Sequence, residues 1–200
     1  SPEKTGYEGE IMNSELIRKD FPILETKVNG HPVVYFDNGA TTQRPLPVMR
    51  AVMNYVTRNN GNPHRGAHIF AMSASEAYDT SKTVVKDFIG AKSEKEIIYT
   101  RNTSESLNLV ARSYGETHLK EGDRILIPVS EHHSNLVPWQ RAAKKTGAVL
   151  EYMYVDKETG HFPEEELKKI DDPRVKILAF AQVSNVLGLS IDARALIRRA

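Results

Sequence analysis

Residues that could bind an anion follow an apolar run near the middle of the chain. Ile97-Ile98-Tyr99 leads through Asn102 to Thr103 and Ser104, and helical spacing of apolar residues begins there. A helix start offers unpaired N–H groups and a positive dipole end, to which two hydroxyls add donors, so a phosphate could be held. The alternative is an ordinary cap formed by Asn102 and Glu105, and the turn taken alone favours it.

A second candidate is the loop 130–135, Ser-Glu-His-His-Ser-Asn, which also follows an expected strand. Adjacent histidines could ligate a metal, stack on a flat ring or act as an acid or base. Neighbouring side chains diverge on regular backbone, so at most one of His132 and His133 is expected in any one site. A polar loop without a role is the alternative.

Two further loops carry polar side chains of suitable chemistry. Residues 62–68 include His64 and Arg65, and arginine offers a fork of donors to a carboxylate or phosphate. Residues 182–188 include Asn185, whose amide could hydrogen-bond a polar ring atom of a ligand. A simple surface turn is the alternative for each.

A metal site would draw on His64, His68, His132 and His133. The first two are spaced i, i+4, which needs a helix, and Pro63 disfavours a helix there. We therefore expect no metal.

The elements that must position these residues alternate between strands and helices. This alternation predicts βαβ units and an α/β fold with a mostly parallel sheet flanked by helices. Polar groups follow three of the expected strands, which places them at one edge of the sheet, where α/β proteins bind ligands. The expected strands are 33–36, 96–100, 124–129, 149–155 and 175–182, and the expected helices are 46–58, 73–89, 104–114, 136–145, 164–170 and one from about Asp192.

The composition is that of a soluble globular protein. Hydrophobic residues make up 40% of the chain and charged residues 26%. A net charge of +1 gives no footprint for nucleic acid, and no window approaches the about 18 apolar residues of a membrane span. The chain has no cysteine, which excludes disulfides and a cysteine nucleophile within it. We expect a cytoplasmic protein with no nucleic-acid or membrane partner.

The pattern divides the chain into three segments. Residues 1–13 are polar and predict a flexible tail, 14–60 a helix/strand/helix segment, and 61–200 part of a large α/β domain. The chain stops at Arg199-Ala200 within a helical pattern, without a Gly cap or a Pro. We expect the α/β pattern to be truncated there.

Several sequence blocks, in order, resemble one family. The chain is similar to the fold-type I enzymes that use pyridoxal 5′-phosphate (PLP), in the class V aminotransferase group, and most of all to Suf-type cysteine desulfurases. Residues 61–200 would then be part of the large PLP-binding domain. The blocks are Arg18–Pro22, Asn29-Gly30, Tyr35–Thr41, His64–His68, Arg101–Leu109, Glu131–Trp139 and Val183–Gly188.

The resemblance implies roles for individual residues. Thr103 and Ser104 would hold the cofactor phosphate, and His132 would stack on the pyridine ring and assist proton transfer. Asn185 would lie beside the cofactor's phenolic oxygen and the substrate carboxylate. The remaining substrate-side residues would be Ala40, His64 and Arg65, the last two in a loop near the active site across a dimer interface.

The resemblance also implies an activity and its limits. The complete enzyme would convert L-cysteine to L-alanine with persulfide sulfur for iron–sulfur cluster assembly, as a homodimer serving a Suf-type sulfur-acceptor protein. The chain departs from the family pattern at Asn102, Ser104 and Gln182, where Gly, Thr and His are usual. The family's Schiff-base lysine and persulfide cysteine would lie beyond residue 200. We therefore expect the 200-residue chain to be inactive alone and to bind PLP weakly or not at all.

The sequence alone is also compatible with three other functions. One is another class V PLP enzyme, such as a selenocysteine lyase or a kynureninase-like enzyme. A second is a non-catalytic truncated chain that serves as a binding or scaffold partner, and a third is a metal-binding domain built on the histidines.

Overall fold

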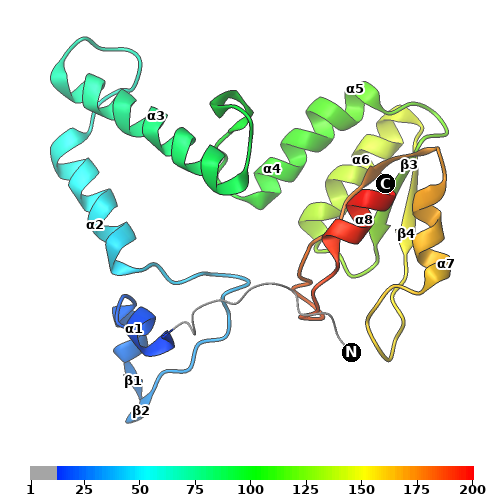
Figure 1. Ribbon diagram of the computed structural model, residues 1–200, viewed down its shortest axis with the longest axis horizontal. Helices are drawn as coiled ribbons and strands as arrows, with labels where there is room; N and C mark the ends of the chain where they lie inside the picture. Colours follow the sequence, from blue (N-terminus) through cyan, green and yellow to red (C-terminus); the bar gives the residue numbers. More distant parts are fainter. Residues whose placement is uncertain (1–12) are drawn as a thin grey trace. The chain divides into compact units, whose positions relative to one another are not determined.

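The computed structural model describes residues 13–200, and the predicted tail lies almost wholly outside this range. The chain forms two compact units, which divide between Ile98 and Tyr99 (Figure 1).

The first unit is mainly helical. Helices were predicted at 46–58 and 73–89, and a helix forms in each place. The second begins at Ile69, four residues earlier than predicted, because the His68 side chain acts as an N-cap and accepts a hydrogen bond from the Ala71 N–H. The elements are α1 Ser14–Arg18, η1 Pro22–Glu25, the antiparallel strands β1 Lys27–Val28 and β2 His31–Pro32, α2 Leu46–Asn54, η2 Tyr55–Asn59, α3 Ile69–Ile89 and η3 Glu94–Glu96.

The strand predicted at 33–36 is wrong. The segment has no regular secondary structure and is not part of either sheet, and the side chains of Val34 and Phe36 are 73% and 94% exposed. A backbone hydrogen bond from the Val33 N–H to the Thr26 carbonyl, 3.0 Å, ties its start to the preceding hairpin. A β-rich run becomes a strand only where another strand completes its ladder.

The second unit is a parallel sheet between helices. The strand order is β4-β3-β5, and both pairings are parallel, as the alternating pattern predicted. The elements are α4 Thr103–Val110, η4 Ala111–Gly115, α5 Glu116–His118, β3 Arg124–Pro128, η5 His133–Asn135, α6 Val137–Thr146, β4 Val149–Met153, α7 Glu164–Leu167, η6 Lys168–Asp171, β5 Val175–Leu178 and α8 Ala193–Arg199.

The central strand β3 is buried on both faces. Ile125 and Ile127 pack into one core cluster with Trp139 of α6, whereas Leu126 packs into another with Leu196 of α8. Successive side chains of a strand point to opposite faces, so β3 separates two apolar layers. The result is a three-layer arrangement with α6 on one face and α8 on the other (Figure 1).

The strand predicted at 96–100 is also wrong. The structure has η3 at Glu94–Glu96 and no regular secondary structure from Ile97 to Thr100. Ile97 is buried, yet no described strand lies beside this segment to complete a ladder. The predicted strands 149–155 and 175–182 form, but end earlier, at Met153 and Leu178.

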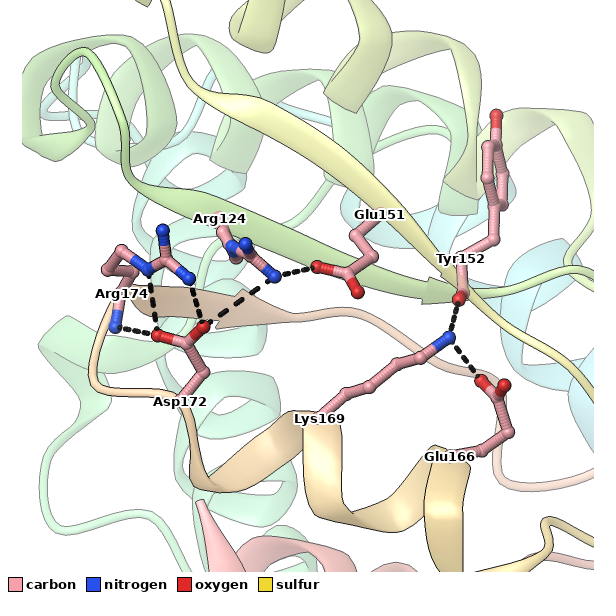
Figure 2. A network of polar contacts seen from close by, with 7 residues as sticks. All are labelled: Arg124, Glu151, Tyr152, Glu166, Lys169, Asp172 and Arg174. Carbon is pink, nitrogen blue, oxygen red and sulfur yellow. Dashed lines mark hydrogen bonds and ion pairs between the residues drawn. The ribbon is translucent and has the colours of Figure 1, made fainter.

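Charged side chains join the three strands at the end where β3 begins. Arg124 Nη1 lies 2.5 Å from Glu151 Oε2 on β4 and 3.6 Å from Asp172 Oδ2, just before β5 (Figure 2). Asp172 also accepts hydrogen bonds from the guanidinium and backbone N–H of Arg174. Lys169 of η6 donates to the Tyr152 carbonyl and to Glu166.

Among residues 13–200, no helix is both long enough and apolar enough to cross a lipid bilayer.

Candidate functional site

The start of α4 is a capped helix, as the simpler interpretation of its sequence predicted. The Asn102 side chain accepts a hydrogen bond from the Glu105 N–H at 2.9 Å, and the Asn102 carbonyl accepts one from the Ser106 N–H. The Glu105 carboxylate reaches back to the Arg101 N–H, 2.7 Å, and to the Arg101 guanidinium. These hydrogen bonds hold the pKa of Glu105 below its usual range, and the bond from the Arg101 backbone N–H has a larger effect than the bonds from its side chain.

Capping does not use the hydrogen-bond donors of the first two residues of α4. Thr103 and Ser104 are exposed, and within residues 13–200 neither their backbone N–H groups nor their hydroxyls have a hydrogen-bond partner. The helix has eight residues and continues into η4 and α5, so its dipole is well developed. Four donors at a positive helix end suit the phosphate group of the implied cofactor.

His132 lies in the loop after β3 and caps η5. Its Nδ1 accepts a hydrogen bond from the Ser134 N–H at 3.1 Å and is 2.8 Å from Ser134 Oγ. A nitrogen that accepts from a backbone N–H carries no proton, so the neutral ring bears its proton on Nε2. The ring is exposed and meets the His133 ring edge to face, with centroids 6.1 Å apart. The cap therefore fixes both the orientation and the tautomer of His132.

Asn185 lies at the tip of a tight loop after β5. Ser184 is 7% exposed, and its hydroxyl accepts hydrogen bonds from the N–H groups of Val186 and Leu187. Val183 pairs with Ser190 to close the loop. Asn185 is exposed, and its side chain makes no hydrogen bond to any residue in the described part of the chain.

The second unit brings these candidate segments to one end of its sheet. α4 packs against η5, which His132 caps. Because β3 and β5 are parallel neighbours, the loops that bear His132 and Asn185 leave the same edge of the sheet. The same edge was predicted for Thr103 and Ser104, but through a strand at 96–100 that does not form; their helix reaches the site by its contact with η5.

Glu131 was not among the predicted site residues. Its Oε1 accepts the Ala181 N–H and its Oε2 accepts Asn135 Nδ2, both at 2.7 Å, which joins the loops after β3 and β5. The signal in the sequence is the i, i+4, i+8 spacing of Glu131, Asn135 and Trp139.

The predicted substrate-side residues Ala40, His64 and Arg65 belong to the first unit, and all three are exposed. Ala40 closes a turn by donating from its N–H to the Asp37 carbonyl. His64 has a positive φ of 60°, and its Nε2 lies 3.6 Å from Asp79 Oδ1. Its N–H donates to Ser75 Oγ of α3, which anchors the loop to that helix.

Within residues 13–200, no cluster of three or more histidine, aspartate and glutamate side chains could hold a metal ion. His68 Nδ1 is instead engaged in capping α3.

The chain belongs to the class-V aminotransferase family, whose model matches residues 34–200. Several of the proteins similar to it are cysteine desulfurases. A probable cysteine desulfurase of Synechocystis sp. is 47% identical over 172 residues, covering 86% of this chain and 41% of that protein. The apo cysteine desulfurase of Thermococcus onnurineus NA1 has a TM-score of 0.83 and 42% identity, covering 93% of this chain and 44% of that one.

A cysteine desulfurase of Escherichia coli shows the same fold, with a TM-score of 0.77 and 33% identity over 94% of this chain and 46% of that one. These matches confirm the resemblance to class V aminotransferases and cysteine desulfurases, and the α/β fold predicted from the alternation of strands and helices. In each case the chain spans less than half the length of the protein that it matches.

Proposed function

We propose that these 200 residues are the N-terminal part of a PLP-dependent cysteine desulfurase. The observation that carries the proposal is the set of unpartnered donors of Thr103 and Ser104 at the start of α4, next to the loop that orients His132. The cysteine desulfurases among the similar proteins support it. L-Cysteine would give up its sulfur to an enzyme thiol, leaving L-alanine and an enzyme persulfide.

The residues of the second unit would bind and orient the cofactor. Thr103 and Ser104 donate to its phosphate, and the exposed face of the His132 ring offers a surface on which a flat pyridine ring can stack. Nε2 of His132 holds a proton that the ring can pass on, which makes His132 the proposed catalytic residue of this chain. The Asn185 amide donates to an oxygen of the cofactor or to the substrate carboxylate. PLP, when bound, supplies the electron sink for the reaction.

The substrate side of the site would include residues of the first unit. Ala40 offers a small side chain in a tight turn, and Arg65 carries a guanidinium suited to a carboxylate. His64 is held by the Ser75 hydroxyl in a conformation that non-glycine residues seldom adopt, and such positions are frequent at functional sites. These features support the proposal that Ala40, His64 and Arg65 face the substrate in the complete protein.

We assign the complete protein to the Suf type, on the blocks Glu131–Trp139 and Val183–Gly188 and the His64–Arg65 loop. A Suf-type protein acts in the cytoplasm as a homodimer and passes its sulfur to a dedicated acceptor protein for iron–sulfur cluster assembly. Sedimentation of the complete protein tests the dimer, and transfer of persulfide sulfur to a candidate acceptor tests the type.

Product analysis of the complete protein tests the activity. We expect equimolar L-alanine and sulfide from L-cysteine in the presence of PLP and a thiol reductant. Alanine from selenocysteine alone, or cleavage of kynurenine, would replace this proposal with another class V activity. The 200-residue chain is expected to release no sulfide, because it contains no cysteine to accept the sulfur.

A further inference from the structure

Glu131 is the point at which two loops of the candidate site are joined. Its carboxylate lies after β3, next to His132, and is partly buried. One oxygen accepts from the backbone N–H of Ala181, fifty residues further along the chain, in the segment that leads from β5 to Asn185. The other oxygen accepts from Asn135 Nδ2. Both distances are 2.7 Å, which is typical of hydrogen bonds to an ionised acceptor.

Asn135 extends this chain of bonds into the core. It is 7% exposed, and its Oδ1 accepts from the indole N–H of Trp139 at 3.0 Å. Trp139 is 3% exposed and packs against β3 from α6. The amide of Asn135 is therefore fixed at both ends: its oxygen must face Trp139 and its NH2 must face Glu131.

We propose that Glu131 is a positioning residue for the cofactor pocket. Its carboxylate holds the loop that carries His132 in register with the segment that carries Asn185, and the buried Asn135–Trp139 pair anchors the carboxylate. This inference rests on the proposed function for its effect on catalysis, although the hydrogen-bond chain itself does not. Glu131 acts through the two loops and need not touch the cofactor.

The direction of each bond yields a variant that breaks the chain and another that restores it. In Glu131→Gln, the new NH2 group faces either the Ala181 N–H or the Asn135 NH2, and two donors then oppose each other. In Asn135→Asp alone, two carboxylates face each other. In the double variant E131Q/N135D, the introduced amide accepts from the Ala181 N–H through its oxygen and donates through its NH2 to the introduced carboxylate. That carboxylate also accepts a hydrogen bond from the Trp139 indole. All three hydrogen bonds of the chain are then restored, and the net charge equals that of the wild type.

The experiment uses the complete protein with the wild-type sequence, E131Q, N135D, E131Q/N135D and the control Glu158→Gln. Glu158 is exposed in the turn after β4, and its side chain makes no bond within the described residues, so its variant matches the loss of charge without touching the chain of bonds. Two readouts are taken: hydrogen–deuterium exchange of the peptide containing Ala181, and the absorbance of bound PLP together with kcat and KM for sulfide release.

In E131Q we expect exchange at Ala181 at least tenfold faster, a changed PLP band and a kcat about tenfold lower. The double variant should recover both readouts to within threefold of wild type, and E158Q should match wild type. A general loss of stability would not be reversed by exchanging donor and acceptor between two residues. Unchanged exchange in E131Q, or a double variant no better than E131Q, overturns the inference. If the wild-type protein releases no sulfide, the proposed function fails, while the exchange measurement still tests the chain of bonds.

Discussion

At the start of α4, capping and anion binding use different groups of the same turn. The Asn102 side chain accepts a hydrogen bond from the Glu105 N–H, and the Glu105 carboxylate accepts one from the Arg101 N–H. The Asn102 carbonyl accepts one from the Ser106 N–H. The donors of Thr103 and Ser104 have no partner among residues 13–200, and they are the groups that we propose for the cofactor phosphate. The Glu105 carboxylate would repel a phosphate if it faced the same way, but it is turned towards Arg101. The two interpretations of this sequence, a capped helix and a phosphate site, are therefore compatible.

This division predicts a specific effect of removing the hydroxyls. In the complete protein, Thr103→Ala and Ser104→Ala should each weaken PLP binding by roughly ten- to a hundredfold, since a hydrogen bond to a charged group contributes about 1.5–3 kcal/mol. Titration of the apoprotein with PLP, followed by absorbance, measures the dissociation constants. Ser113→Ala is the matched control, because its hydroxyl lies further along the same helical run and donates to the Leu109 carbonyl. Equal affinity in all three variants would remove these hydroxyls from the phosphate site.

Candidate site residues on short polar loops could be proposed from the sequence because their side chains carry the donors, acceptors and flat rings that a ligand would need. Thr103, Ser104, His132 and Asn185 all follow apolar runs, and the second unit presents them as exposed groups. Glu131 could not be found in this way, since its partner Ala181 is fifty residues distant and contributes a backbone N–H that almost any residue type would supply. Contacts to backbone leave little trace in a sequence.

At the scale of elements, helices were easier to predict than strands. A helix satisfies its hydrogen bonds within its own segment, so the apolar spacing of α3 and the cap at Gly147 of α6 were enough. The segments 33–36 and 96–100 have strand composition but have no neighbouring strand among the described residues. The buried strand β3 formed as predicted because β4 and β5 complete its ladders on both sides.

The charged network across the sheet gives a prediction of pH dependence (Figure 2). The pKa of Asp172 is held well below its usual range. The hydrogen bond from the Arg174 guanidinium lowers it most, the hydrogen bond from the Arg174 backbone N–H comes next, and the charge of Arg124 adds a smaller effect. A carboxyl whose pKa is lowered by folding stabilises the protein above its unfolded pKa of about 3.9 and loses that effect as the pH falls towards the folded value. Asp172→Asn should therefore lower the free energy of unfolding at pH 6–7, and the difference from wild type should shrink below about pH 4.

Urea unfolding at a series of pH values, followed by Trp139 fluorescence, measures this difference. Asp20→Asn serves as the control, because Asp20 is exposed and lies outside the network in the first unit. A difference between D172N and wild type that stays constant from pH 7 to pH 3 would show that Asp172 does not act through its charge.

At the scale of the whole chain, the buried apolar residues are unevenly distributed. Among the described residues of the first unit, the buried ones are Ala71, Ala74 and Ile97, two of which are small. The second unit has two core clusters, which include large side chains such as Trp139, Leu126 and Met153. Burial of apolar surface is the main source of folding free energy, so the second unit holds most of the stability that this chain can supply.

Dividing the chain at the boundary between the units should therefore give two unlike products. Residues 99–200 should unfold cooperatively in urea, with an m value of about 1 kcal/mol/M or more, because both faces of their sheet are covered. Residues 1–98 should show helical circular dichroism without a cooperative transition, since α2 and α3 bury few side chains. Trp139, the one tryptophan of the chain, reports on the second unit, and circular dichroism at 222 nm reports on the first. A cooperative transition in residues 1–98, or its absence in residues 99–200, would contradict this distribution of stability.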